Sequence, residues 1–266
     1  MKYYTKRMTA LSEVSLSEIS NLYSHNYGSY SSESTVNLGK RIRYSIKMYK
    51  KNYTKDDYYI SYAVDDSDKL IGFAIYIRKQ YQKKQTITWV VQLVVDIAYR
   101  GKGIASRILQ SIWGFSDDFA WGLATTNSCT IKALENATFR KVSSKYIMSH
   151  LSELSAVFED VPFTVINELE LDESHSLINS HFYVDYSSVV TPEREQTLGL
   201  GRIKPGYEWF AFVFRDQPLD KTLIRDKFHT FISFSESKLI DAYKRMLPRQ
   251  GWMRGTNMKA IKRLYP

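Results

Sequence analysis

The segment from residue 86 to residue 113 constrains the fold most, because a strand pattern, a glycine turn and a helix pattern follow one another directly. Thr86–Val95 is a β-branched and aromatic run that predicts a buried strand. Arg100–Ala105 then carries two glycines, and apolar residues at 104, 108, 109, 112 and 113 have helical spacing. A glycine turn that opens a helix leaves backbone N–H groups unpaired at the positive end of the helix dipole. The segment therefore predicts a cradle for an anion such as phosphate.

The longer string Val95–Ala105 resembles motif A of the GNAT superfamily, the acetyl-CoA-dependent N-acetyltransferases. In that motif a strand ending in valine precedes Gln or Arg, two variable residues, Gly, one variable residue, and Gly or Ala. Arg100, Gly103 and Ala105 occupy the three defined positions. The string is not a Walker loop, since no Gly-Lys-Ser/Thr closes it, and it lacks the three spaced glycines of a dinucleotide fingerprint.

A second match lies downstream. Asn127–Phe139 resembles the family's next strand-to-helix element, in which an Asn starts the segment and the helix ends in Gly-Phe. The Leu134-Glu135 pair is closer to the ribosomal-protein N-terminal acetyltransferase branch than to the branch with a tyrosine there. Thr138 stands where the family has glycine, and a β-branched residue resists the left-handed conformation that ends such a helix. The resemblance covers roughly residues 1–150, with its specific motifs in 86–142.

The expected fold class is α/β (α+β): a GNAT-type mixed, mostly antiparallel sheet flanked by helices, with an additional C-terminal α+β region. Periodicity places a regular series of elements in the expected GNAT domain, residues 1–150. The expected strands are Met1–Ala10, Tyr58–Val64, Leu70–Ile77, Thr86–Val95, Ala120–Thr125 and Arg140–Ser149, and the expected helices are Ser12–Tyr27, Ser31–Tyr49, Gly103–Trp113 and Thr130–Ala137.

The family pattern fades beyond Leu151, and residues 151–266 are expected to form a C-terminal α+β extension of unknown role. The expected helices there are Leu151–Phe158 and Ser235–Leu247, and the expected strands are Phe163–Leu171 and Tyr207–Phe214. These elements either extend the first sheet or form a small domain of their own, and the sequence leaves both arrangements open.

The resemblance implies a coenzyme site at the end of the motif A strand. That strand and the next one splay apart at a bulge in this fold, and pantetheine pairs with the exposed edge as an added strand would. Backbone amides at a Val95 bulge would polarise the thioester carbonyl, and the amides from Gly101 through Ser106 would hold the pyrophosphate. The expected coenzyme-binding residues are Leu93, Val94, Val95, Arg100, Gly101, Lys102, Gly103, Ile104, Ala105, Ser106 and Asn127.

The motifs do not identify a general base or acid. Many relatives carry a Glu on the motif A strand, where the nearest polar residue here is Gln92, and the family's tyrosine acid falls at Leu134. The candidates for proton transfer are Gln92, Asp96 and Glu208, although Asp96 also fits a solvated turn carboxylate. No metal is expected, because the five histidines lack ligand spacing. Cys129 is expected to be a small half-buried helix residue and not a nucleophile, because no histidine lies near it in sequence.

Composition predicts a soluble globular protein, with 44% hydrophobic and 24% charged residues. The single cysteine excludes internal disulfides and multi-cysteine zinc sites. No apolar run approaches the roughly 18 residues of a membrane span, and the N-terminus lacks a signal-peptide core. The expected location is therefore cytoplasmic, with no membrane partner.

The net charge of +9 is uneven, and the basic residues gather at 40–51, at 78–84 and at 244–263. Such clusters favour acidic partners, although a solvated face with counter-charge for coenzyme phosphates also explains them.

The leading hypothesis is an acetyl-CoA-dependent N-acetyltransferase whose amine acceptor is a protein, a small molecule or an aminoacyl-tRNA. The alternatives are a catalytically inactive coenzyme A-binding regulatory module, and an RNA- or DNA-binding protein that stacks bases on Trp252 and Tyr265.

Overall fold

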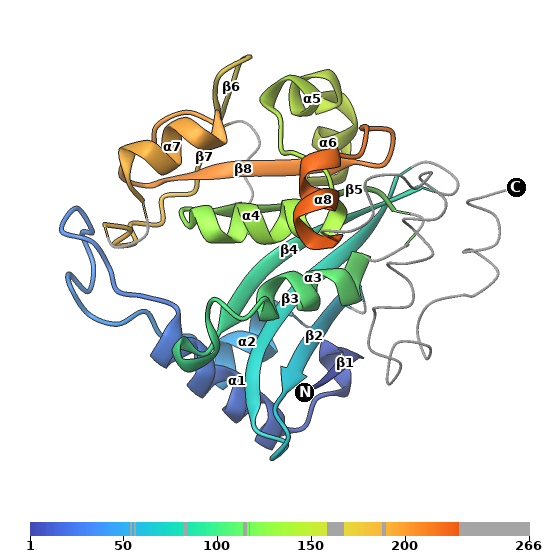
Figure 1. Ribbon diagram of the computed structural model, residues 1–266. Helices are drawn as coiled ribbons and strands as arrows, with labels where there is room; N and C mark the ends of the chain where they lie inside the picture. Colours follow the sequence, from blue (N-terminus) through green and yellow to red (C-terminus); the bar gives the residue numbers. More distant parts are fainter. Residues whose placement is uncertain are drawn as a thin grey trace, which may run out of the picture.

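The computed structural model describes residues 1–53, 55, 57–81, 85–113, 116, 118–158, 168–187 and 190–228. Within them a single eight-stranded sheet has the strand order β1-β2-β3-β4-β5-β8-β7-β6 (Figure 1). Neighbouring strands are antiparallel except β4 and β5, which are parallel. The expected mixed, mostly antiparallel sheet is confirmed. The strands are β1 (Lys2–Arg7), β2 (Tyr58–Val64), β3 (Leu70–Tyr81), β4 (Gln85–Val95), β5 (Asp118–Thr125), β6 (Leu169–Leu171), β7 (Ser176–Asn179) and β8 (Tyr207–Phe214).

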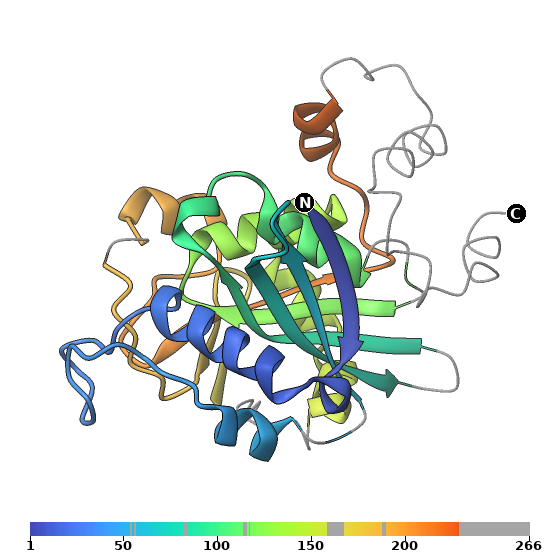
Figure 2. The same cartoon turned by 90° about the horizontal axis from the view of Figure 1, so that it is seen from below.

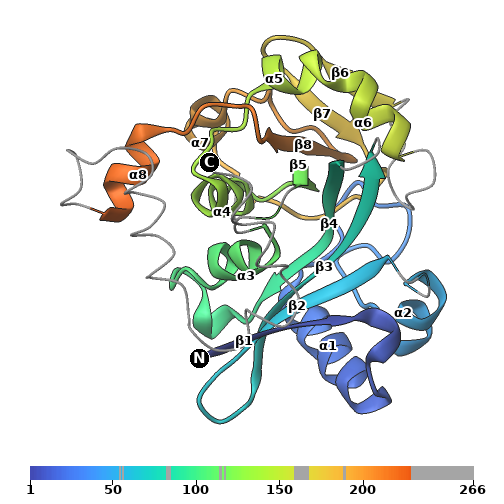
Figure 3. The same cartoon turned by 90° about the vertical axis from the view of Figure 1, so that its right-hand side faces the viewer.

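Helices cover both faces of this sheet (Figure 3): α3 and α4 lie on one side, and α1, α2 and α6 lie on the other. Ser12 begins α1 by accepting a hydrogen bond from the Ser15 N–H, as the predicted helix start requires. The helices are α1 (Glu13–Asn26), α2 (Ile46–Asn52), α3 (Ile104–Trp113), α4 (Ser128–Thr138), α5 (Ser144–Ser149), α6 (Leu151–Phe158), α7 (Pro192–Leu198) and α8 (Lys221–Phe228), with short 3-10 turns η1 (Met8–Ala10) and η2 (Ile97–Tyr99).

The sheet continues across residue 150, so the C-terminal region extends the first sheet. β8 pairs antiparallel with β5, and Trp209 lies opposite Thr125. The six residues Trp209–Phe214 are fully buried on both faces, and the rings of Phe210 and Phe212 pack against Trp89 with centroids 5.6 and 5.3 Å away. This aromatic layer joins the N-terminal strands to the C-terminal region in one core. A functional division at residue 150 stays a prediction.

The predicted helix at Ser31–Tyr49 is wrong over most of its length, because only Ile46–Asn52 is helical. Asn37 and Gly39 have positive φ angles of 56° and 66°, which a helix interior does not accept. The preceding chain loops back so that the Tyr30 N–H donates to the Lys40 carbonyl at 3.0 Å. Val36 and Leu38, apolar residues of the predicted helix, are 60% and 61% exposed. Figure 2 shows this loop projecting from the body of the molecule.

The predicted strand at Arg140–Ser149 is also wrong, since this segment forms a loop followed by α5. The sheet position beside β5 is occupied by β8, whose longer apolar run buries more surface there.

The end of α4 also differs from the expectation. Phe139, not Thr138, is left-handed with φ of 55°, and the Thr138 hydroxyl donates back to the Leu134 carbonyl at 2.9 Å. Thr138 therefore avoids the conformation that its branched side chain resists.

Several predicted features lie outside the described residues: the helix at Ser235–Leu247, most of the strand at Phe163–Leu171 and the basic cluster at 244–263. In the part of the chain that is described, no helix is both long enough and apolar enough to cross a bilayer. The same part holds no group of three or more His, Cys, Asp or Glu side chains that could bind a metal ion.

Candidate coenzyme and catalytic site

The site lies where β4 and β5 part. Their pairing ends with Val90 opposite Leu123, whereas β4 runs on to Val95 and the end of β5 pairs with β8 instead. The expected splay is therefore present. The bulge that accompanies it lies at Val91 and not at Val95, because the register with β3 jumps from Val90 to Gln92 there. We call the opening between the ends of β4 and β5 the wedge.

The end of β4 presents alternate backbone groups to the wedge. The Asp96 N–H donates to the Ile71 carbonyl at 2.9 Å, which fixes the hydrogen-bonded side of the β3–β4 pair. Antiparallel alternation then turns the backbone of Val94 toward β3 and the backbones of Leu93 and Val95 toward the wedge. Two of the three predicted edge residues thus offer N–H groups to an added strand. The Val95 carbonyl already accepts a hydrogen bond from the Arg100 Nε at 3.1 Å.

The turn between β4 and α3 is an open nest of backbone N–H groups. Gly101 and Gly103 have φ angles of 75° and 74°, and no atom lies within 4 Å of the place where either would carry a Cβ. The first helical bond is the one from the Arg107 N–H to the Gly103 carbonyl at 3.1 Å. The N–H groups of residues 101–106 consequently find no acceptor among the described residues. An orphaned row of donors at a helix start suits the pyrophosphate of coenzyme A.

The two cations of this turn hold its shape. The Arg100 guanidinium donates to the Val95 carbonyl and to the main-chain carbonyl of Asn26. The Lys102 ammonium donates to the Ala98 carbonyl at 2.9 Å and lies 5.0 Å from the centre of the Tyr99 ring. Their hydrogen bonds go to the protein itself, and a direct contact of either side chain with the coenzyme stays a prediction.

Asn127 stands at the other side of the wedge, directly after β5. Its side-chain oxygen caps α4 by accepting from the Cys129 N–H at 2.9 Å, and its own N–H donates to the Thr125 hydroxyl at 3.0 Å. The residue that the motif singles out thus sets the start of α4. Its contact with coenzyme or water stays a prediction.

Two of the three candidates for proton transfer are engaged in holding the structure. The Gln92 side chain is buried and accepts a hydrogen bond from the Tyr49 hydroxyl at 3.1 Å. Asp96 accepts from the Ala98 N–H at 3.0 Å and forms an ion pair with Lys69 at 3.1 Å. The hydrogen bond from Ala98, followed by that from Lys69, lowers the pKa of the Asp96 carboxyl. An amide has no basic group, and a carboxylate with a lowered pKa is a weak base.

The surroundings of Glu208 raise the pKa of its carboxyl, whereas those of Asp96 lower it. It lies at the start of β8, next to Trp209, which pairs with the last residue of β5 at the wedge. Burial raises the pKa of the Glu208 carboxyl, and the hydroxyl of Ser180 opposes that rise only in part. The Glu208 charge in turn adds to the effect of burial in raising the pKa of Tyr27, at the end of α1. A half-buried carboxyl with a raised pKa beside an opening is typical of a general base.

An aromatic wall that includes Tyr27, a neighbour of Glu208, was not predicted from the sequence. The ring of Phe182 lies 6.0 Å from that of Tyr27 and 6.2 Å from that of Tyr30, centre to centre. A short backbone bridge between Tyr30 and Val184 joins the loop after α1 to the C-terminal region. Twenty tyrosines in the chain were the only sequence signal, and their abundance is explained equally well by general packing. The wall exists because residues from two distant segments meet.

Comparison with known proteins agrees with this geometry. Residues 17–122 match the model of the acetyltransferase (GNAT) family. Residues 17–122 therefore carry a GNAT acetyltransferase domain. No curated protein sequence matches the chain significantly.

Solved acetyltransferase structures are similar to the chain at low identity. The NatC complex bound to Gag peptide and CoA is 19% identical, over 57% of this chain and 93% of that chain, with a TM-score of 0.37. Arabidopsis thaliana NAA60 in complex with a bisubstrate analogue is 17% identical, over 53% and 85%, with a TM-score of 0.38. The ribosomal-protein-alanine N-acetyltransferase from Brucella melitensis is 15% identical, over 43% and 70%, with a TM-score of 0.32.

Proposed function

We propose that the protein transfers the acetyl group of acetyl-CoA to a primary amine by direct attack within a ternary complex. The observation that carries the proposal is the row of N–H groups at residues 101–106 without protein acceptors, next to the free edge of β4. Bound acetyl-CoA would supply a thioester whose carbonyl carbon accepts a neutral amine. The turn would hold its pyrophosphate, and the N–H groups of Leu93 and Val95 would pair with its pantetheine.

We further propose that Glu208 accepts the proton that the amine loses. Burial raises its pKa, which makes it a stronger base than an ordinary glutamate, and it lies close to Tyr27 at the end of α1. The tyrosine hydroxyls nearby cannot take this part, because burial raises the pKa of Tyr27 and Tyr49 and keeps both phenols protonated. An ammonium that approaches Glu208 would also meet the ring of Tyr27, and aromatic faces attract cations.

The proposal is tested by following thiol release. The purified protein is incubated with acetyl-CoA and separate amines: peptides with free N-termini, lysine peptides, aminoglycosides and aminoacyl-tRNA. We expect coenzyme A thiol to appear above the hydrolysis background with at least one class, and native mass spectrometry to detect the bound coenzyme. Coenzyme binding without thiol release from any amine would identify the regulatory module instead, and failure to bind coenzyme A would refute both.

A further inference from the structure

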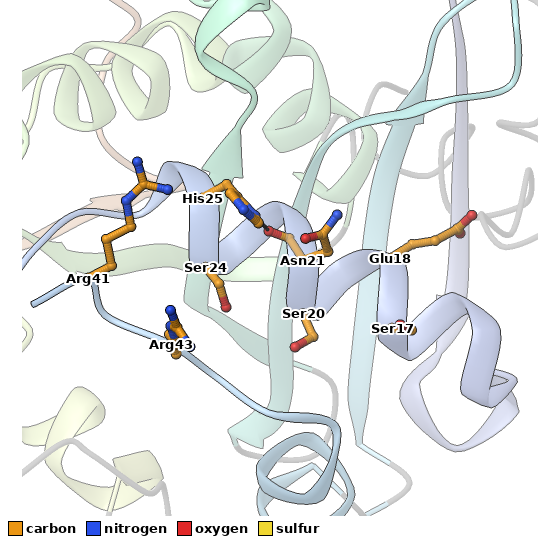
Figure 4. A pocket seen from close by; sticks show the side chains of 8 residues that line it. All are labelled: Ser17, Glu18, Ser20, Asn21, Ser24, His25, Arg41 and Arg43. Atoms are coloured by element: carbon orange, nitrogen blue, oxygen red, sulfur yellow. Dashed lines mark hydrogen bonds between the residues drawn. The ribbon is translucent and has the colours of Figure 1, made fainter.

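A polar pocket lies on the outward face of α1, away from the sheet (Figure 4). Its volume of about 520 Å³ falls within the roughly 300–1,000 Å³ of small-ligand sites. Ser17, Asn21 and Ser24 line it from α1, and their spacing puts them on one face of the helix. The polar atoms of these three side chains form no hydrogen bond with other described residues, so they are open to a ligand.

Two arginines line the pocket from the segment that leads into α2. Arg41 and Arg43 are exposed, whereas Ile42 and Tyr44 between and after them are only 3% and 7% exposed. This alternation along an extended segment turns both guanidinium groups to the same side. The Ser20 hydroxyl donates to the Tyr44 carbonyl at 2.7 Å, which fixes the segment against α1. The walls of the pocket are therefore already in place.

The charged residues differ between the two ends of the pocket. Neither Arg41 nor Arg43 forms an ion pair within the described part of the chain. A guanidinium without an ion-pair partner can bind a carboxylate or a phosphate through two parallel hydrogen bonds. Glu18 lines the pocket at the opposite end of the row from Arg41, as Figure 4 shows. Among the described residues that line it, the imidazole of His25 is the one aromatic ring and no Phe, Tyr or Trp is present, so a ligand is recognised mainly by charge and hydrogen bonds.

We propose that this pocket binds a peptide segment through a single carboxylate or phosphate group. Arg41 and Arg43 hold the anion, and the hydroxyl and amide groups of α1 bond the adjoining peptide, with Glu18 facing a hydrogen-bond donor. A nucleic-acid strand carries an anion on every nucleotide, so its next phosphate would meet the Glu18 carboxylate. The pocket therefore selects an isolated anion and disfavours a polyanion. The binding is independent of the acetyl transfer proposed above.

Fluorescence anisotropy with short labelled peptides tests this inference. The peptides have a blocked N-terminus and no lysine, so they cannot accept an acetyl group, and they differ at one position: phosphoserine, glutamate or serine. We expect the phosphoserine or the glutamate peptide to bind and the serine peptide not to bind; the two anionic arms tell which source supplies the anion. The double variant Arg41→Gln, Arg43→Gln should weaken binding at least about tenfold. The matched variant Lys145→Gln, Lys221→Gln, which removes two exposed charges elsewhere, should change it less than about twofold.

Three outcomes would overturn the proposal. They are failure of both anionic peptides to bind, an equal loss in the two double variants, and tighter binding of a short single-stranded RNA that is also lost in the arginine variant. All four substituted residues are exposed, so the variants should unfold at the wild-type temperature. Partial recovery of binding in Arg41→Lys, Arg43→Lys would show that the charge acts at this place.

Discussion

The guanidinium of Arg100 donates a hydrogen bond to the main-chain carbonyl of Asn26, although 74 positions separate the two residues. The Asn26 side chain accepts from the Ile97 N–H at 2.9 Å, so the end of α1 contacts the coenzyme turn twice. Arg100, which occupies a defined position of motif A, thus orders the turn by donating hydrogen bonds to main-chain carbonyl groups of the protein. The same contacts place the end of α1, and with it Tyr27, relative to the turn and to Glu208.

Gly103→Ala should weaken coenzyme A binding by at least about tenfold, because a left-handed Ala is strained and the backbone shift that relieves the strain would move the N–H groups of the turn. Isothermal titration calorimetry measures the dissociation constant. Gly199→Ala is the matched control, since Gly199 has φ of 62°, nothing within 4 Å of its Cβ position, and a place after α7. Similar weakening by both substitutions would show that strain, not the N–H nest, governs binding.

Glu208→Gln should lower kcat/KM for the amine by about 10²–10⁴-fold, the usual contribution of a general base. The wild-type rate should rise with pH as Glu208 loses its proton, at a pH above the ordinary range of a glutamate, and this limb should vanish in the variant. A carboxyl whose folded pKa is raised contributes stability below its unfolded pKa and loses it as pH rises through the folded value. The variant should therefore unfold at an equal or higher temperature than wild type at neutral pH. An unchanged pH profile would exclude Glu208 as the base.

Asp118→Asn should lower the free energy of unfolding by about 3 kcal/mol, the lower end of the range for breaking a buried pair, because Arg78 is partly hydrated. Asp118 is fully buried, pairs with Arg78 and accepts from the Thr88 hydroxyl at 2.6 Å. Urea denaturation measures the change. Asp66→Asn, in which a 93% exposed side chain is altered, should cost less than about 1 kcal/mol. Equal costs would show that the buried pair adds nothing specific.

Gly122→Ala should destabilise the fold by about 1–3 kcal/mol or more, because the new Cβ would stand 2.3 Å from the Phe212 Cε1 atom. Thermal and urea unfolding measure the loss. Replacing the ring as well, with Gly122→Ala and Phe212→Leu together, should cost less than the sum of the two single substitutions. Strict additivity would contradict the proposed clash between β5 and β8.

Local pattern alone determined the parts of the chain whose side chains repeat with one clear period. β2, β4, α1 and α3 lie within a few residues of their predicted bounds, because each buries a face that its own sequence marks. The glycines of the coenzyme turn were equally readable, since a left-handed backbone at 101 and 103 favours glycine wherever the chain folds.

Tertiary contact decided the rest. The segments 140–149 and 207–214 were both predicted as strands, and the one that buries Trp209–Phe214 on both faces lies beside β5. Residues 31–45 carry apolar residues at helical spacing, yet Gly39 and the bridge to Val184 direct them into a loop. Glu208 has a raised pKa only because β8 carries it into apolar surroundings next to Tyr27. Burial and proximity of distant segments are set by the packed fold, and no local period in a sequence encodes them.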